Sequence, residues 1–210
     1  MQSDEARQWK DAIDVELETL RILLTLAAIW NYEIDQIDVT TAFLHGDIDV
    51  VVFMEQPEGY VQKDKEDFVC MLLKSLYGLK QAPRVWFRLL KKFLERELYT
   101  LMKCETCVAV KVIDGLLVFI SIYGDDLILF ARTKAMMRDM KQMLFKRFVM
   151  KDLDLIHYIL GWEITRNRQA RTIFIKPKKY AKKVLQHFAM DECNGCKVPS
   201  DPSLRLSKAM

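Results

Sequence analysis

The pattern of hydrophobic and polar positions predicts two helices at the beginning of the chain. Between residues 5 and 20, large apolar side chains recur at helical spacing, at Trp9, Ile13, Leu17 and Leu20. The stretch from Leu20 to Trp30 is rich in residues that favour helix. No linker separates the two stretches, so we expect the second helix to follow directly on the first.

Alternation of polar and apolar residues predicts a strand with one buried face over residues 33–39. Asp38 lies at the end of this strand. Further short strands are expected at residues 50–54 and 68–73. Pro57, Glu58 and Gly59 mark a loop between them.

Two hairpins that share a strand are predicted in the middle of the chain. Asp114-Gly115, a dipeptide typical of tight turns, separates β-rich stretches at residues 107–113 and 116–122. Tyr123-Gly124-Asp125-Asp126 then separates the second stretch from a short apolar run at residues 127–130. The acidic pair is therefore expected at the tip of a hairpin.

The remaining elements are three amphipathic helices and one more strand pair. Helices are predicted at residues 83–98, where Pro83 suits the first turn, and at 133–148 and 178–188, which are both basic. Strands are predicted at residues 158–165 and 172–175. The fold class that follows is α+β, an antiparallel sheet with helices packed on it.

The composition is that of a folded protein. The chain has 210 residues, of which 51% are hydrophobic and 29% charged, with 7 Gly and 5 Pro, and this excludes collagen-like and disordered classes. The longest nearly apolar stretch, Leu20 to Trp30, contains Arg21 and is too short to cross a bilayer. The N-terminus lacks the regions of a signal peptide. We therefore expect a cytoplasmic or nuclear protein that is not secreted and has no membrane partner.

Charge is divided unevenly along the chain. Residues 1–70 hold 5 Lys and Arg against 16 Asp and Glu, a net charge of −11, whereas residues 71–210 carry +14. The basic part predicts contact with a polyanion, and the acidic part offers carboxylates for a metal ion. Solvated faces of opposite charge would give the same division, and charge alone does not separate the two interpretations.

The five cysteines are an odd number in a chain without a secretory signal, so reduced thiols are expected. Cys104 and Cys107, and Cys193 and Cys196, have the spacing of zinc-ligand pairs. More than eighty residues separate the pairs, far beyond the usual spacing of a zinc ribbon, which argues against zinc.

Adjacent carboxylates at a hairpin tip suggest a metal site. The charges of Asp125 and Asp126 repel each other unless a cation lies between them. If the strand that ends at Asp38 is a neighbour in the same sheet, three carboxylates can hold two Mg²⁺ ions about 4 Å apart, as in phosphoryl transfer. Hard oxygen ligands favour magnesium. The alternative is an exposed turn, in which aspartate is common.

Successive blocks of the sequence resemble reverse transcriptases of copia-type LTR retrotransposons. The blocks are residues 36–46, 53–60, 75–84 and 123–126, and shorter similarities follow at 150–153, 159–161 and 179–180. They occur in the family's order over nearly the whole chain. The resemblance implies a palm domain of an RNA-directed DNA polymerase, whose partners are deoxynucleoside triphosphates and an RNA or DNA template with its primer.

The resemblance also assigns the catalytic residues. Asp38, Asp125 and Asp126, with the backbone carbonyl of Val39, would hold Mg²⁺ (or Mn²⁺). Phe43 matches the bulky residue under the sugar of the incoming nucleotide, where its ring would exclude a 2′-hydroxyl. Core packing is the alternative interpretation of Phe43.

Other residues take their expected roles from the same blocks. Tyr77 and Gly78 would line the nucleotide site, while Lys80 and Arg84 would contact phosphate or be ordinary surface charges. Tyr123 and Gly124 would lie at the primer terminus. Trp162 falls where the primer grip is expected, although a half-buried core tryptophan fits equally. Basic residues that include Lys178 and Lys179 would follow the duplex backbone without reading its sequence, so binding should weaken with salt.

Two departures from the family pattern matter. Residues 1–20 resemble the start of the polymerase region, but residue 21 begins a helix that normally comes several dozen residues later, so most of the fingers is missing. The expected division is an N-terminal helix left from the fingers at 1–20, the palm at 21–150, and the palm end with primer-grip-like strands and the start of the thumb or connection at 151–210. The second departure is Gly124, where the family usually has Val.

The sequence thus predicts a reverse transcriptase fragment that extends a primer by two-metal phosphoryl transfer. The absent fingers support a different hypothesis, an inactive remnant that serves as a nucleic-acid-binding or protein-interaction module. A third hypothesis is a reduced polymerase whose fingers come from a partner chain or a homodimer. It predicts an exposed apolar face on the helix from Leu20 to Trp30.

Overall fold

The computed structural model describes residues 4–193, apart from the side chains of Glu5, Trp9, Lys178 and Lys179. The chain divides into two compact units, and each is described by itself. The first comprises residues 1–156 and 166–173, and the second comprises 157–165 and 174–210.

The first unit is built on a six-stranded sheet with the order β4-β5-β6-β7-β1-β8. All five strand pairs are antiparallel. The strands are β1 (Glu33–Val39), β4 (Thr100–Leu101), β5 (Val108–Ile113), β6 (Leu116–Tyr123), β7 (Asp126–Ala131) and β8 (Met150–Leu155). The helices are α1 (Asp4–Ile29), α2 (Ala82–Arg96), α3 (Lys134–Phe145) and a short 3₁₀ helix η1 (Ala42–His45), and β2 (Phe53–Glu55) pairs with β3 (Val69–Met71) outside the main sheet. An antiparallel sheet with packed helices confirms the predicted fold class.

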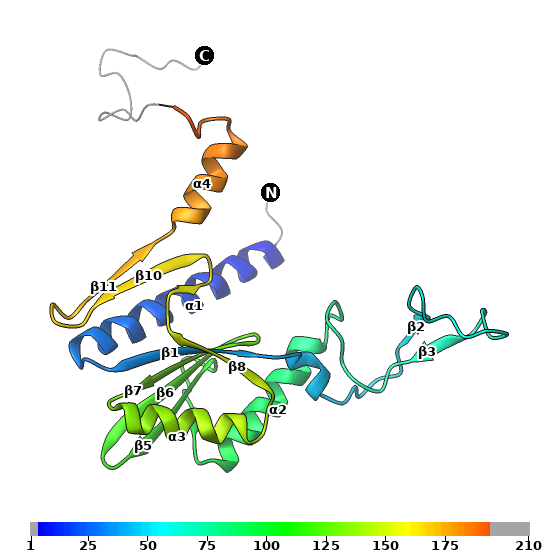
Figure 1. Cartoon of the computed structure of the whole chain (residues 1–210), viewed down its shortest axis with the longest axis horizontal. Helices are drawn as coiled ribbons and strands as arrows, with labels where there is room; N and C mark the ends of the chain where they lie inside the picture. The colour runs from blue at the N-terminus through cyan, green and yellow to red at the C-terminus, as the bar shows by residue number, and fades with distance from the viewer. Residues whose placement is uncertain (1–3, 194–210) are drawn as a thin grey trace. The chain divides into compact units, whose positions relative to one another are not determined.

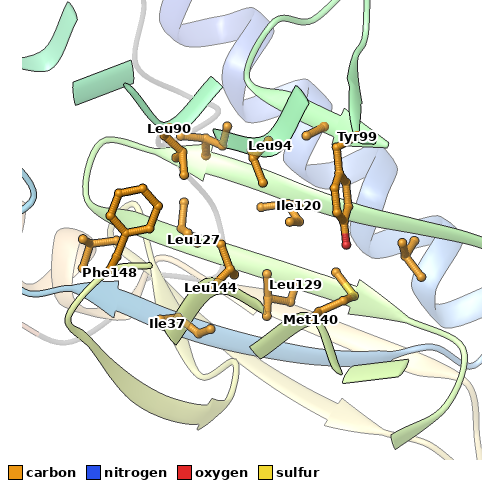
Figure 2. Packing of buried hydrophobic residues seen from close by; sticks show 14 of the residues in the cluster. Ile37, Leu90, Leu94, Tyr99, Ile120, Leu127, Leu129, Met140, Leu144 and Phe148 are labelled. Atoms are coloured by element: carbon orange, nitrogen blue, oxygen red, sulfur yellow. The ribbon is translucent and has the colours of Figure 1, made fainter. Parts of the chain in front are cut away.

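The main core lies between one face of the sheet and helices α2 and α3. Leu90 and Leu94 from α2 meet Met140 and Leu144 from α3 over a floor of strand residues that includes Leu129. Figure 2 shows these side chains between the helices and the strands. Figure 1 shows α1 on the other side of the sheet from α2 and α3. Both faces of the central strands are therefore covered, which explains why β6 and β7 are almost wholly apolar.

Strand β1 follows the alternation that its sequence predicts. Ile37 and Val39 belong to the core under α2 and α3, so Gln36 and Asp38 point to the opposite face, because successive side chains of a strand alternate. The strand thereby directs the carboxylate of Asp38 away from the main core.

Both predicted tight turns are present. Asp114 and Gly115 have φ values of 50° and 77°, the two positive values that a type I′ turn requires. Helix α3 begins at its predicted position because the Thr133 side chain accepts a hydrogen bond from the backbone N–H of Met136 at 3.2 Å.

Three predictions of secondary structure were wrong or incomplete. The two expected N-terminal helices are one continuous helix, because nothing between residues 4 and 29 breaks it. The expected strand at 158–165 is two strands, β9 (Tyr158–Ile159) and β10 (Trp162–Asn167), since Leu160 and Gly161 turn with positive φ. Strands β4 and β8 were not predicted.

The second unit contains part of a small sheet of order β11-β10-β9, with β11 at Thr172–Lys176, and helix α4 at Lys178–His187. The backbone N–H of Ile164 donates to the carbonyl of His157 at 2.9 Å, which closes the turn between β9 and β10. Across the described residues, no helix is long and apolar enough to span a membrane.

Candidate active site on the β6–β7 hairpin

The β6–β7 turn holds the acidic pair in a fixed backbone conformation. Tyr123 pairs with Asp126, which leaves Gly124 and Asp125 as the two central residues of the turn. Gly124 has a φ of 63°, a value that glycine adopts without the strain of a β-branched residue. The glycine in place of the family's usual valine therefore suits this turn.

Two hydrogen bonds attach the turn to the rest of the unit. The indole N–H of Trp86, which is buried on α2, donates to the carbonyl of Gly124 at 2.8 Å. The backbone N–H of Val39 donates to the carbonyl of Asp125 at 3.0 Å. The turn is thus fixed from α2 on one side and from the end of β1 on the other.

The sheet register brings the third carboxylate to the hairpin. Asp38 on β1 is the direct cross-strand partner of Asp126 on β7. Paired residues of antiparallel strands share one face of the sheet with their Cβ atoms about 5 Å apart. Asp38 and Asp126 are therefore neighbours, with Asp125 next to them in the turn, and the strand adjacency on which the prediction depended is present.

Each hairpin carboxylate accepts a hydrogen bond from a neutral side chain. The amide of Gln36, a residue that is 4% exposed, donates to Oδ1 of Asp126 at 3.0 Å. The hydroxyl of Tyr77 donates to Oδ2 of Asp125 at 3.0 Å. The two carboxylates are thus hydrogen-bonded by different residues.

The electrostatics of the site reflect crowded acids. Burial raises the pKa of Asp126, and the charges of Asp125 and Asp38 raise it further, while the hydrogen bond from Gln36 opposes the shift. The pKa of Tyr77 is also raised, first by burial and then by its hydrogen bond to Asp125. Tyr77 therefore stays protonated and remains a donor at neutral pH.

The donor set matches the chemistry of a hard divalent cation, since it consists of three carboxylates on adjacent segments. Within residues 4–193, however, no three acidic, cysteine or histidine side chains converge closely enough to enclose one ion. Asp125 is hydrogen-bonded to Tyr77 and Asp126 to Gln36.

A reverse transcriptase family model, described as an RNA-dependent DNA polymerase, matches residues 9–202. The chain belongs to this family. The β6–β7 hairpin and Asp38 lie within the matched residues.

Relatives of this reverse transcriptase domain are large transposon polyproteins. The chain is 38% identical over 197 residues to the retrovirus-related Pol polyprotein from transposon TNT 1-94 of Nicotiana tabacum, which covers 93% of the chain and 15% of that protein. It is 31% identical over 193 residues to the corresponding polyprotein from transposon RE1 of Arabidopsis thaliana, covering 92% and 13%. For the transposon Ty1-BR Gag-Pol polyprotein of Saccharomyces cerevisiae the identity is 28% over 190 residues, covering 87% and 10%. The chain therefore spans 10% to 15% of the length of these curated relatives.

Two aromatic residues lie beside the acids of this reverse transcriptase domain. The rings of Phe43 and Tyr77 are tilted against each other with their centroids 4.4 Å apart. Phe43 is half-buried and packs against the main core, so both of its predicted roles remain compatible with its position. Gly78, next to Tyr77, has a φ of 94° and open space around it.

The residues predicted to contact nucleic acid are distributed over both units. Lys80 and Arg84 are exposed in the first unit. Tyr123 is buried, and burial raises its pKa to about 12. In the second unit, Trp162 is half-buried on β10 and Lys178 and Lys179 begin α4.

Two residues of the site had no role assigned from the sequence. Trp86 lies on the buried face of α2, and nothing in the local sequence indicates that its N–H reaches Gly124. The sequence could have placed Gln36 in the site, because alternation along β1 puts its side chain on the same face as that of Asp38. A polar residue on a buried face requires a partner, and that partner is Asp126.

The cysteine pairs are incompletely covered by the structure. Cys104 and Cys107 carry free thiols, and Cys193 is free as well. Cys196 lies outside the described residues. Burial, with a contribution from Glu105, raises the pKa of the Cys107 thiol to about 11, which disfavours the thiolate that zinc requires.

Proposed function

We propose that this reverse transcriptase domain is a copia-type palm that adds deoxynucleotides to a primer 3′-hydroxyl on an RNA or DNA template. The observation that carries the proposal is the pairing of Asp38 with Asp126, with Asp125 in the adjoining turn. Two strands from distant parts of the sequence supply acids to one face of one sheet. If Asp125 and Asp126 formed only an ordinary exposed turn, no third acid would be needed opposite Asp126 on the neighbouring strand.

Asp38, Asp125 and Asp126, with the carbonyl of Val39, would hold Mg²⁺ or Mn²⁺. A bound divalent ion lowers the pKa of an attacking hydroxyl and neutralises the charge of the leaving pyrophosphate. The contribution of the chain itself is positioning, since the Trp86 and Val39 hydrogen bonds fix the turn that carries two of the acids.

The ring of Phe43 selects deoxynucleotides by its shape, and Tyr77 and Gly78 form the neighbouring wall of the nucleotide site. The 4.4 Å contact between the Phe43 and Tyr77 rings supports this assignment, because it makes one aromatic surface beside Asp125. The open space at Gly78 leaves room for a ligand next to that surface.

Contacts to the primer and template involve residues of both units. We assign the primer terminus to Tyr123 and Gly124, the primer grip to Trp162, and backbone phosphates to Lys80, Arg84, Lys178 and Lys179. The support is the net charge of +14 after residue 70. Binding through phosphates releases counterions, so affinity is expected to fall steeply as salt is raised.

We also propose the division into a fingers remnant at 1–20, a palm at 21–150 and a palm end with the start of the thumb or connection at 151–210, of which residues 194–210 lie outside the described chain. Helix α1 runs without interruption across the proposed junction at residues 20 and 21. A continuous helix is what remains if the two flanking helical segments are joined in phase. The phase is favourable, since Leu20, Leu23, Leu24 and Ala27 are all buried.

One observation favours a partner that supplies fingers or forms a homodimer. Val15, Ile22 and Ile29 repeat every seven residues on α1 and are 50%, 60% and 56% exposed. This spacing places them along one side of the helix, as in a helix–helix contact. Light scattering of the purified chain tests the homodimer, which a monomer at all concentrations would contradict.

Primer extension tests the proposed function. The purified chain is given a DNA primer on an RNA template with Mg²⁺ or Mn²⁺, beside Asp38→Asn, Asp125→Asn, Asp126→Asn and the exposed-loop control Asp67→Asn. We expect primer extension that Asp67→Asn retains. Substitution of Asp38, Asp125 or Asp126 should reduce it by several orders of magnitude, because electrostatic stabilisation is the largest contribution to such catalysis.

Absence of extension in the wild-type chain would reject the catalytic proposal. If salt-sensitive binding to primer–template persists in that case, the domain is a nucleic-acid-binding remnant. A fluorescence anisotropy titration at two salt concentrations supplies this second measurement.

A further inference from the structure

An open cavity lies at the end of the main sheet that is remote from the acids. Its volume is about 320 Å³, within the range of about 300–1,000 Å³ that is usual for small-ligand sites. It is lined by Trp30, Tyr32, Gly115, Leu116, Leu117 and Arg132. Tyr32 precedes Asp38 by six residues of extended chain, a separation of about 20 Å. The cavity is therefore distinct from the candidate active site.

Strand register brings three of the lining residues into one row. Glu33 of β1 pairs with Ala131 of β7, so the next residues outward, Tyr32 and Arg132, stand opposite each other. On the other side of β7, extension of the β6 register places Leu117 opposite Arg132. The hydroxyl of Tyr32 donates to the carbonyl of Leu117 at 2.8 Å. The backbone of Arg132 thus lies between two residues that are joined by a hydrogen bond.

Aromatic rings form one wall of the cavity. Trp30 packs against Tyr32 with the ring centroids 5.5 Å apart, and it stacks on Phe119 with the centroids 6.5 Å apart. Tyr32 is buried, whereas Trp30 is only half-buried and lines the cavity with part of its indole. A partly exposed indole that is supported by two other rings offers a surface on which a planar group can stack.

The segment that carries these rings is held by two arginines of the first unit. The guanidinium group of Arg166 donates to the carbonyls of Tyr32 and Ala27, the latter at 3.3 Å. Arg168 donates to the carbonyl of Asn31 at 3.0 Å. The turn between α1 and β1 is therefore fixed without a ligand, which lowers the conformational entropy that binding would cost.

Arg132 supplies an uncommitted positive charge to the same cavity. Its side chain is exposed, and within residues 4–193 it forms no ion pair. Burial raises the pKa of Tyr32, and the nearby charge of Arg132 partly offsets this rise. Arg168 shows the contrast, because its guanidinium group is paired with Glu33. A guanidinium group keeps its charge and matches phosphate oxygens with paired N–H donors, so Arg132 is available for an anion.

We propose that this cavity binds a nucleotide, with the base stacked on the indole of Trp30 and the phosphate on Arg132. The lining can recognise a planar ring and an anion, and a nucleotide joins these two groups in one molecule. Leu116 and Leu117 make the remaining apolar surface, and the open space around Gly115 leaves the edge of the cavity unobstructed. A free mononucleotide and an unpaired residue of a single strand present the same chemistry, and the experiment separates them.

Nuclear magnetic resonance of the tryptophan indole N–H groups reports on the cavity directly. The full chain, labelled with ¹⁵N, is titrated in EDTA with AMP, adenosine, inorganic phosphate or the trinucleotide pApApA. EDTA removes divalent ions, so the acids take no part. The Trp30 signal is identified by its loss in Trp30→Phe. The other variants are Arg132→Met, Arg132→Lys and a matched control, Arg96→Met, at an exposed arginine of α2.

We expect AMP to shift the Trp30 signal with saturation and to bind about tenfold more tightly than adenosine, the usual size of a hydrogen-bonded contact to a charged group. Phosphate alone should leave the signal in place. Arg132→Met should weaken AMP binding and leave adenosine binding unchanged, while Arg132→Lys should retain part of the difference. Arg96→Met should resemble the wild type. Tighter binding of pApApA than of AMP would identify a single strand as the ligand, and equal or weaker binding would identify the mononucleotide.

Three results would overturn the inference. They are a Trp30 signal that AMP does not shift, AMP binding that Arg132→Met and Arg96→Met weaken equally, and a joint loss of AMP and adenosine binding in Arg132→Met, which would indicate a structural role. None of these measurements involves catalysis or a metal ion. The proposed polymerase activity can therefore fail while this nucleotide site stands, and the reverse also holds.

Discussion

The hydroxyl of Tyr77 donates a hydrogen bond to Oδ2 of Asp125 at 3.0 Å, although the two residues are 48 positions apart in the sequence. Tyr77 also packs its ring against Phe43. One residue thereby connects the proposed nucleotide wall with a proposed metal ligand. An ion that uses Oδ2 of Asp125 as its ligand would compete with this hydrogen bond.

Substitution Tyr77→Phe should increase the affinity for Mn²⁺ by roughly three- to tenfold, because it removes the competing donor from Asp125 while keeping the ring. Electron paramagnetic resonance of free Mn²⁺ measures the change. Tyr60→Phe is the matched control, since Tyr60 is 82% exposed in the loop between β2 and β3. An unchanged or lower affinity in Tyr77→Phe would show that the hydrogen bond does not restrain the carboxylate.

Asp126→Asn should stabilise the domain at neutral pH. The raised pKa of Asp126 means that the folded state binds its proton more tightly than the unfolded state does. The protonated side chain of Asp126 therefore stabilises the folded state at low pH. This stabilisation is lost as the pH rises through the pKa of Asp126 in the folded state. We expect a gain in the free energy of unfolding of less than about 1 kcal/mol at pH 7, since the half-exposed site is screened.

Urea denaturation at several pH values checks this prediction. The gain should disappear below about pH 4, where the ordinary aspartate pKa lies and the wild-type side chain is protonated in both states. Asp67→Asn, in an exposed loop, should show no such pattern. A gain that persists unchanged at acid pH would mean that the charge of Asp126 is not its source.

Trp86→Phe should loosen the β6–β7 turn. The substitution removes the donor to the Gly124 carbonyl and leaves a small cavity in the core, at a cost of about 1–3 kcal/mol. Hydrogen exchange gives the sharper readout, because the amide of Val39 bonds to Asp125 and should exchange faster. In Trp30→Phe, a change at a half-buried tryptophan, Val39 should exchange at the wild-type rate. If the amide of Val39 exchanged at the same rate in both variants, the hydrogen bond from Trp86 would not be what holds the turn.

Gly46→Ala should destabilise the domain by about 1–3 kcal/mol through a clash alone. Gly46 has an ordinary φ of −92°, but a Cβ there would lie 2.3 Å from Cγ1 of Val85 on α2. Val85→Ala removes that methyl group, so the double variant should be more stable than Gly46→Ala by itself. Thermal unfolding of the four proteins measures the coupling, and strictly additive effects would contradict the clash.

Local signals in the sequence were sufficient for much of the fold. The alternation over residues 33–39 predicted β1, and Asp114-Gly115 and Gly124 predicted the two hairpin turns. Strand β8 escaped prediction because it is an edge strand with a register shift opposite residues 35–37 and a positive φ at Asp154. These irregularities remove the period of two on which strand prediction depends.

The sequence by itself determined which residue types were present for the chemistry and which local elements carried them. Asp38 at a strand end and Asp125-Asp126 at a hairpin tip followed from patterns within a few residues. The tertiary structure alone decided that Gln36 meets Asp126 across 90 positions and that Trp86 reaches Gly124. Strand register and helix packing arise from contacts between distant segments, and no local periodicity contains that information.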